Sequence, residues 1–208
     1  DCMAQDYGNP SSTHSLGRHA KSILELSRKS IAKALNAAAQ EILFTSGGTE
    51  ANNWILRSAV KDLKVRRIIS SKMEHHAVLY PILELQKEFD IQVEYVENSA
   101  DGVLDLTHLV DLLSESTEKT LVSLMHVNNE TGVILDLERV SQICQEHHAL
   151  FHSDTVQSVG KAILDLQKVP VDFIVSSAHK FHGPKGVGFA FIRKNSGLQP
   201  LFFGGEQE

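Results

Sequence analysis

Short apolar runs typical of β-strands alternate with amphipathic segments along most of this 208-residue chain. The strand patterns lie over 41–45, 67–70, 91–96, 120–125, 149–153, 173–176 and 187–192. Helical patterns cover 13–38, 50–62, 76–88, 106–113 and 137–147. Strands that alternate with helices form right-handed βαβ units, which place helices on both faces of one sheet. We therefore expect an α/β fold with a mostly parallel sheet of about seven strands.

Composition excludes several classes of protein. The net charge of −6 gives no general attraction for nucleic acid, and no apolar run approaches the roughly 18 residues that a membrane span needs. The two cysteines, Cys2 and Cys144, are too few for a disulfide scaffold or a cysteine zinc site. We expect a reduced, cytoplasmic protein that binds neither nucleic acid nor membrane.

The chain opens at Asp1 and stops at Glu208, shortly after two glycines. From these ends we expect a piece of a longer protein, with an exposed leading segment over 1–12 and one α/β domain over 13–208. Ligands of such sheets bind beyond the carboxyl ends of the strands. The polar residues that follow each strand are therefore the candidates for function.

A glycine-rich turn, Ser46-Gly-Gly-Thr-Glu50, follows the strand pattern over 41–45 and opens a helix. Backbone N–H groups and the helix dipole would bind an anion there, and Thr49 would add a hydroxyl. The alternative for Gly48 and Thr49 is an ordinary capped strand-to-helix turn.

Histidine and asparagine follow two further strands. His75 could stack on a flat ligand or move protons, whereas a solvent-facing histidine at a helix start is the alternative, and the one we favour for His76. Asn129, in the segment His126-Val-Asn-Asn-Glu-Thr-Gly132, could donate to a ligand oxygen or serve only the turn.

A carboxylate and a lysine follow the strand patterns over 149–153 and 173–176. Asp154 has no Lys or Arg beside it in sequence, and a carboxylate in apolar surroundings usually has a cationic partner. Gln157 could reach the same ligand, and a helix N-cap is the alternative for Asp154. Lys180 comes directly after a buried strand pattern, with Ser177 and His179 before it, so we expect a desolvated, nucleophilic amine.

These strand ends together match one cofactor. A ligand with a phosphate, a flat ring with a protonated nitrogen, a ring oxygen and an aldehyde would use all of them, and pyridoxal 5′-phosphate (PLP) has that inventory. The 11 histidines also suggest a metal hydrolase as an alternative. That function explains fewer of these residues, and no HExxH pattern is present. We therefore predict PLP as cofactor and no metal.

The chain resembles the large domain of the cysteine desulfurases, PLP enzymes of fold type I in the class V aminotransferase group. The motifs that carry the resemblance are Tyr7-Gly-Asn-Pro-Ser-Ser12 with His14, Phe44–Glu50, Glu74-His75, His126–Glu130 with Gly132, Asp154–Lys161, and Ser177–Lys180 with Gly183–Gly186. They cover nearly the whole chain in the family's order.

The resemblance implies a role for each candidate residue. Lys180 would attach the cofactor covalently and move protons, and Asp154 would pair with the ring nitrogen. His75 would stack on the ring and assist proton transfer. The phosphate would be held by Gly48, Thr49, Ser177 and His179, and the ring oxygen or the substrate would be approached by Gln157 and Asn129.

The family reaction converts L-cysteine to L-alanine and leaves the sulfur as a persulfide on an enzyme cysteine. A sulfur-acceptor or scaffold protein then takes it for iron–sulfur clusters or thiolated cofactors, and family members are homodimers. The resemblance implies three family features that we expect to lie outside these 208 residues: the opening segment before Tyr7, the loop with the sulfur-accepting cysteine, and the C-terminal small domain. Cys144 lies on the apolar face of a helix pattern and is expected in the core, so the 208 residues alone are expected to be inactive.

Related activities stay open at this point. A selenocysteine lyase, a cystine lyase or an aminotransferase would share the cofactor residues, and the loop that distinguishes them is outside this chain. A non-catalytic fragment that binds PLP is a further alternative.

Overall fold

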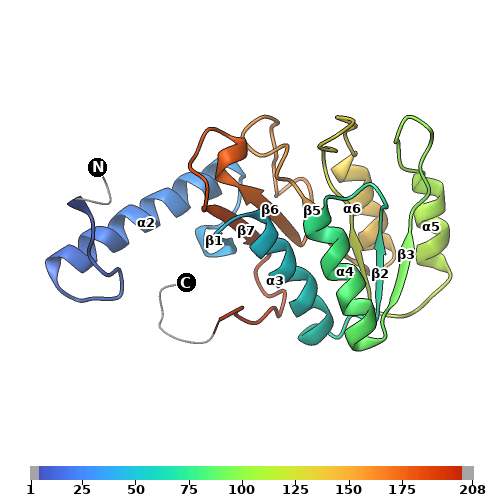
Figure 1. The fold of residues 1–208 in the computed structure, drawn as a ribbon, viewed down its shortest axis with the longest axis horizontal. Helices are drawn as coiled ribbons and strands as arrows, with labels where there is room; N and C mark the ends of the chain where they lie inside the picture. The colour runs from blue at the N-terminus through green and yellow to red at the C-terminus, as the bar shows by residue number, and fades with distance from the viewer. Residues whose placement is uncertain (1–4, 203–208) are drawn as a thin grey trace.

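The computed structural model describes residues 5–202, which build one seven-stranded sheet in the order β1-β7-β6-β5-β4-β2-β3 (Figure 1). Four neighbouring pairs, from β3 to β6, are parallel, whereas β7 runs antiparallel to both β6 and β1. The mostly parallel sheet is confirmed, with one reversed strand. The strands are β1 (Ile42–Thr45), β2 (Arg67–Ser70), β3 (Gln92–Tyr95), β4 (Thr120–Ser123), β5 (Leu150–Asp154), β6 (Phe173–Ser177) and β7 (Gly188–Ile192).

The helices lie close to the expected places. They are α2 (Ser15–Ala34), α3 (Gly48–Lys61), α4 (His76–Phe89), α5 (Leu106–Ser114) and α6 (Leu137–Glu146), with short 3-10 turns η1 (Ala39–Glu41) and η2 (Ala178–Lys180). The first helix ends four residues earlier than expected, because Asn36 adopts a left-handed conformation (φ 52°) just beyond it. α3 begins at Gly48, two residues earlier than expected, which places Gly48 and Thr49 in its first turn.

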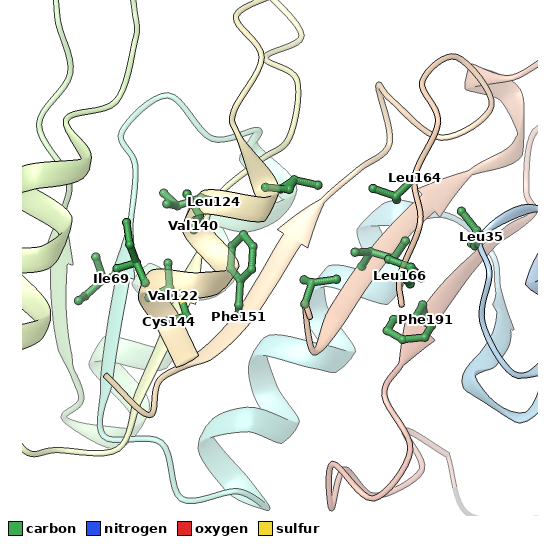
Figure 2. Packing of buried hydrophobic residues seen from close by; sticks show 14 of the residues in the cluster. Leu35, Ile69, Val122, Leu124, Val140, Cys144, Phe151, Leu164, Leu166 and Phe191 are labelled. Carbon is green, nitrogen blue, oxygen red and sulfur yellow. The ribbon is translucent and has the colours of Figure 1, made fainter. Parts of the chain in front are cut away.

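Two hydrophobic cores lie on the two faces of the sheet. Neighbouring strand residues alternate between them: Ile68 packs with α3 and α4, whereas Ile69 packs with α5 and α6. Cys144 of α6 lies in the second core beside Val140, where Figure 2 shows it near Phe151. Burial raises the pKa of the Cys144 thiol far above its usual range. The prediction that Cys144 is a core residue is confirmed; Cys2 lies outside the described residues.

Little of the first helix is buried. Only Gly17, Ala20 and Ala32 are buried in α2, whereas Leu16 and Leu26 are 46% and 62% exposed. Figure 1 shows the N-terminal part of α2 extending away from the sheet, which leaves these two leucines outside both cores. In the described part of the chain, no helix is both long and apolar enough to span a bilayer.

His152 makes the stability of the fold depend on pH. Its side chain is fully buried in β5, its Nδ1 lies 2.9 Å from Ser123 Oγ, and its Nε2 has no partner. Burial lowers the pKa of His152 from its ordinary value of 6.5 to about 3. Below about pH 6.5 His152 is therefore protonated in the unfolded chain but stays neutral in the folded chain. The free energy of unfolding consequently decreases as the pH falls below about 6.5.

We expect His152→Gln to remove this dependence. Relative to the variant, the wild-type free energy of unfolding should fall by about 1.4 kcal/mol per pH unit below about pH 6. Urea unfolding of both proteins between about pH 5 and 8 measures the difference, and all other titrating groups cancel in it. A difference that stays constant with pH would mean that His152 is not neutral in the folded chain.

Candidate functional site

A cavity of about 400 Å³ lies beyond the carboxyl ends of the strands, a size in the range of small-molecule sites. Residues that follow β1, β2, β4, β5 and β6 line it. All nine residues singled out in the sequence are among them: Gly48, Thr49, His75, Asn129, Asp154, Gln157, Ser177, His179 and Lys180. The lining also includes Asn52, Ala77, Met125, Glu130 and Val156, which sequence reasoning did not select.

The topology explains why these segments meet. Two antiparallel pairings in succession leave β1 running in the same direction as β6, so the turn after β1 reaches the same edge. β7 starts between them at Gly188, where a Cβ atom would lie 2.7 Å from Gly47 Cα and 2.3 Å from Ser176 O. Glycine at this position therefore lets the turn after β1 cross over the start of β7 toward β6.

The N-terminus of α3 is fixed to the end of β6 by one buried hydrogen bond. Gly48 N donates to Ser177 Oγ over 2.8 Å. A Cβ on Gly48 would lie 2.6 Å from Val156 Cγ2, so the turn after β5 packs closely on the same point. The first turn of a helix with no capping side chain thus faces the cavity, and its N–H groups and dipole favour an anion.

Replacing Ser177 by alanine should destabilise the fold by about 1 kcal/mol, because Gly48 N then loses its buried acceptor. Ser176 is a matched control, since its hydroxyl is buried without a partner and Ser176→Ala removes no hydrogen bond. Urea unfolding measures both variants. Equal losses in the two would show that the Gly48–Ser177 contact contributes nothing specific.

His75 combines a structural and a cavity position. It is the N-cap of α4, where its Nδ1 accepts from Ala77 N over 3.0 Å, as the alternative interpretation expected. In the neutral ring the proton is then on Nε2. His75 nevertheless lines the cavity, whereas the exposed His76 stacks on Tyr80 outside it.

In the loop after β4, the neighbouring residues Asn128 and Asn129 have different roles. Asn128 serves the turn: its Oδ1 accepts from Glu130 N and Thr131 N, each over 2.9 Å. Asn129 is exposed toward the cavity, with Nδ2 donating to Glu130 Oε1 over 2.7 Å. Across the cavity lining, Gln157 Oε1 accepts from Lys161 Nζ over 3.4 Å. These amides are therefore available to a ligand at the cost of weak, exposed contacts.

Asp154 is the last residue of β5 and its carboxylate is 5% exposed. Oδ1 accepts from Val156 N over 3.0 Å, and Oδ2 accepts from Asn52 Nδ2 over 2.8 Å. No ion pair with Asp154 exists among residues 5–202, and a turn rather than a helix follows it, so it is not a helix N-cap. Burial raises the pKa of Asp154, and the bond from Asn52 opposes that rise.

Lys180 differs from its expected environment. It ends η2, the 3-10 turn that follows the fully buried β6, and its side chain lines the cavity. The chain end of β6 is buried, but Lys180 and His179 themselves are exposed. The expected desolvation of the Lys180 amine is therefore wrong for this chain, because the turn lifts the residue out of the core to the cavity's open side.

Two buried polar residues near the cavity received no role in the predictions from sequence. Asn52 is 1% exposed on a helix face that otherwise carries Ala51 and Ile55, and a polar residue in such a stripe is a usable signal. Glu74, next to His75, is buried, and its Oε1 accepts from Met125 N over 2.8 Å. Burial raises the pKa of Glu74 well above its usual range, and the nearby Asp154 adds to the rise. Among residues 5–202, no three His, Cys, Asp or Glu gather where they could hold a metal ion.

The fold and the cavity define an α/β protein in which a helix N-terminus, a lysine and a buried carboxylate without an ion-pair partner among residues 5–202 line one cavity at the edge of the sheet. The family model for aminotransferase class-V matches residues 2–208. The chain belongs to this family.

Curated relatives and solved structures agree with this assignment. The chain is 42% identical over 208 residues to "Cysteine desulfurase IscS" of Dictyoglomus turgidum, and 39% identical over 214 residues to the protein of the same name from Pseudoalteromonas translucida. The matches cover 99% and 100% of this chain but 52% of each relative, so the chain spans about half their length.

The solved structures give the same fold. A "NifS-like protein" matches with a TM-score of 0.93 and 41% identity over 99% of this chain and 57% of its own. "SspA in complex with cysteine" matches with a TM-score of 0.92 and 31% identity over 99% of this chain and 60% of its own.

Proposed function

We propose that the protein containing these residues is a PLP-dependent cysteine desulfurase. The observation that carries the proposal is Asp154: a buried carboxylate, without an ion-pair partner among the described residues, in a cavity that also holds Lys180. A buried carboxylate is stable when a cation or a strong donor faces it. A protonated ring nitrogen fits that requirement.

The other cavity residues fit the remaining groups of PLP. The phosphate would lie at the first turn of α3, with Gly48, Thr49, Ser177 and His179 around it. Gln157 and Asn129 would donate to the ring oxygen or the substrate carboxylate, and His75 would stack on the ring. Lys180 would be the attachment point.

PLP, when bound, supplies the electron sink that lets the Cα–H and C–S bonds of an amino acid break. The residues of this chain then have separate tasks. Asp154 keeps a proton on the ring nitrogen. The Lys180 amine holds the cofactor and, once displaced by the substrate amine, carries protons to and from the substrate, with His75 assisting at its Nε2.

We further propose L-cysteine as substrate and L-alanine as product. A thiol of the enzyme attacks the substrate sulfur, so that the C–S bond breaks and a persulfide forms on that thiol. Cys144 does not fit this task, because a buried thiol with a raised pKa forms little thiolate. The proposal therefore includes a sulfur-accepting cysteine outside residues 5–202, in a protein where residues 13–208 form a large domain beside a C-terminal small domain.

Three observations support the substrate. The relatives at 42% and 39% identity are named cysteine desulfurases, and one structural neighbour is described in complex with cysteine. The cavity volume suits a cofactor of PLP's size with a small amino acid. A cytoplasmic homodimer that passes sulfur to an acceptor or scaffold protein completes the proposal.

Product analysis tests this function. The protein containing these residues is incubated with PLP, L-cysteine and a thiol reductant, and alanine, sulfide, pyruvate and ammonia are measured. We expect alanine and sulfide in equal amounts. Pyruvate and ammonia would indicate a lyase that eliminates sulfide, and an amino-group transfer to an added keto acid would indicate an aminotransferase; either result as the main reaction overturns the proposal.

A further inference from the structure

Asn52 is an unexpected residue for its position. It lies in the second turn of α3, on the face that packs against the sheet, and it is 1% exposed among Ala51, Ile55 and Leu56. A buried side-chain amide destabilises a core unless its hydrogen bonds are made. Its Oδ1 is buried with no partner, so the packing of α3 alone does not explain an asparagine here.

The one bond that Asn52 does make is to the cavity carboxylate. Asn52 Nδ2 donates to Asp154 Oδ2 over 2.8 Å, while Val156 N donates to Oδ1 over 3.0 Å. One donor on each oxygen fixes the plane of the carboxylate, because rotation about its terminal bond would break both. Each oxygen keeps a free lone pair for a further donor.

The surroundings of Asp154 make this donor important. Burial raises the pKa of Asp154, and the hydrogen bonds from Asn52 and Val156 N oppose the rise, with a smaller electrostatic contribution from His75. The contact from Asn52 is the largest of the influences that lower the pKa of Asp154. Losing it would leave the carboxyl group protonated over a wider pH range.

We propose that Asn52 is a positioning residue, which acts through Asp154 to hold an oriented carboxylate toward the ring nitrogen of the cofactor. The inference rests on the proposed PLP site and deepens it. Asn52 touches Asp154 from the helix whose first turn would hold the phosphate. The same helix would thus contact the phosphate directly and the ring nitrogen through Asp154.

Two substitutions and a matched control test the proposal. Asn52→Ala removes the amide, and Asn52→Leu replaces it by a side chain of similar volume that suits the apolar face. The control is Asn53→Ala, since Asn53 is the next residue of α3 and its Nδ2 donates to Thr49 O on the exposed side. PLP affinity is measured by titrating the visible absorption of the bound cofactor at several pH values, alongside thermal unfolding.

We expect both Asn52 variants to fold and to bind PLP about tenfold more weakly at neutral pH, the equivalent of about 1.4 kcal/mol. The deficit should shrink as the pH rises, because Asp154 then ionises without help. Asn53→Ala should bind like the wild type. A loss of PLP affinity that is independent of pH, or that is equal in Asn53→Ala, would show a general effect on α3 and overturn the proposal.

The remaining outcomes are also informative. Failure of Asn52→Leu to fold would count against the inference, because it would assign the amide to folding rather than to the site. Wild-type affinity in both Asn52 variants, with loss in Asp154→Asn, would overturn the role of Asn52 while the PLP site stands. Absence of PLP binding by the wild-type protein would instead overturn the proposed function.

Discussion

Lys180→Ala is expected to abolish covalent attachment of PLP while the fold is retained. The visible absorption band and the adduct trapped by borohydride should both disappear, because no other lysine lines the cavity formed by the described residues. The fold should be unaffected, since Lys180 is exposed at the end of η2 and makes none of the hydrogen bonds or ion pairs found in residues 5–202.

The matched control for this variant is Lys185→Ala. Lys185 is also exposed and lies in the turn between β6 and β7, but it is not part of the cavity lining. It should keep the wild-type spectrum and adduct. An unchanged borohydride adduct in Lys180→Ala, together with its loss in Lys185→Ala, would transfer the attachment point to Lys185.

Asp154→Asn is expected to lower activity and PLP affinity without a parallel loss of stability. Asparagine cannot keep a proton on the ring nitrogen, so turnover by the protein containing these residues should fall by orders of magnitude. Affinity for PLP should fall about ten- to a hundredfold, because a charge-assisted hydrogen bond of about 1.5–3 kcal/mol is lost.

In the cofactor-free chain, Asp154→Asn should affect stability in the opposite direction to its effect on turnover and PLP affinity. Burial raises the pKa of Asp154 in the folded chain, so the folded state favours the protonated acid. Relative to Asp154→Asn, the wild type should therefore lose stability as the pH rises from the unfolded value of 3.8 through the raised folded value. Urea unfolding without PLP at acidic and neutral pH measures this difference. A normal spectrum and turnover in the variant would leave Asp154 a purely structural residue.

The position of the site was predictable because the sheet topology was. Once strands and helices alternate, the ends of parallel strands must share one edge, and polar residues at five such ends must be neighbours. Asp154 and Ser177 are separated by the irregular segment 155–172 and most of β6, and they line the same cavity for this reason. Apolar neighbours in sequence also indicated correctly that Cys144 is buried.

Features that depend on local chain geometry were not predictable in the same way. Exposure of Lys180 follows from the 3-10 turn after β6, which a strand pattern does not reveal. The reversal of β7 did have a signal: residues 178–187 contain only the three residues of η2, too few for the crossover helix that a parallel return needs. The contact between Asn52 and Asp154 joins residues 102 positions apart and required the packing of α3 on β5.

Peptide mapping of the borohydride-reduced protein tests the cofactor site most directly. The wild-type protein is incubated with PLP, reduced, digested, and each lysine-containing peptide is weighed by mass spectrometry. We expect one phosphopyridoxyl group on the peptide that carries Lys180, and its absence when Ser177 and Asp154 are both replaced. Label spread over surface lysines such as Lys161 and Lys185, or no label at stoichiometric PLP, would contradict it.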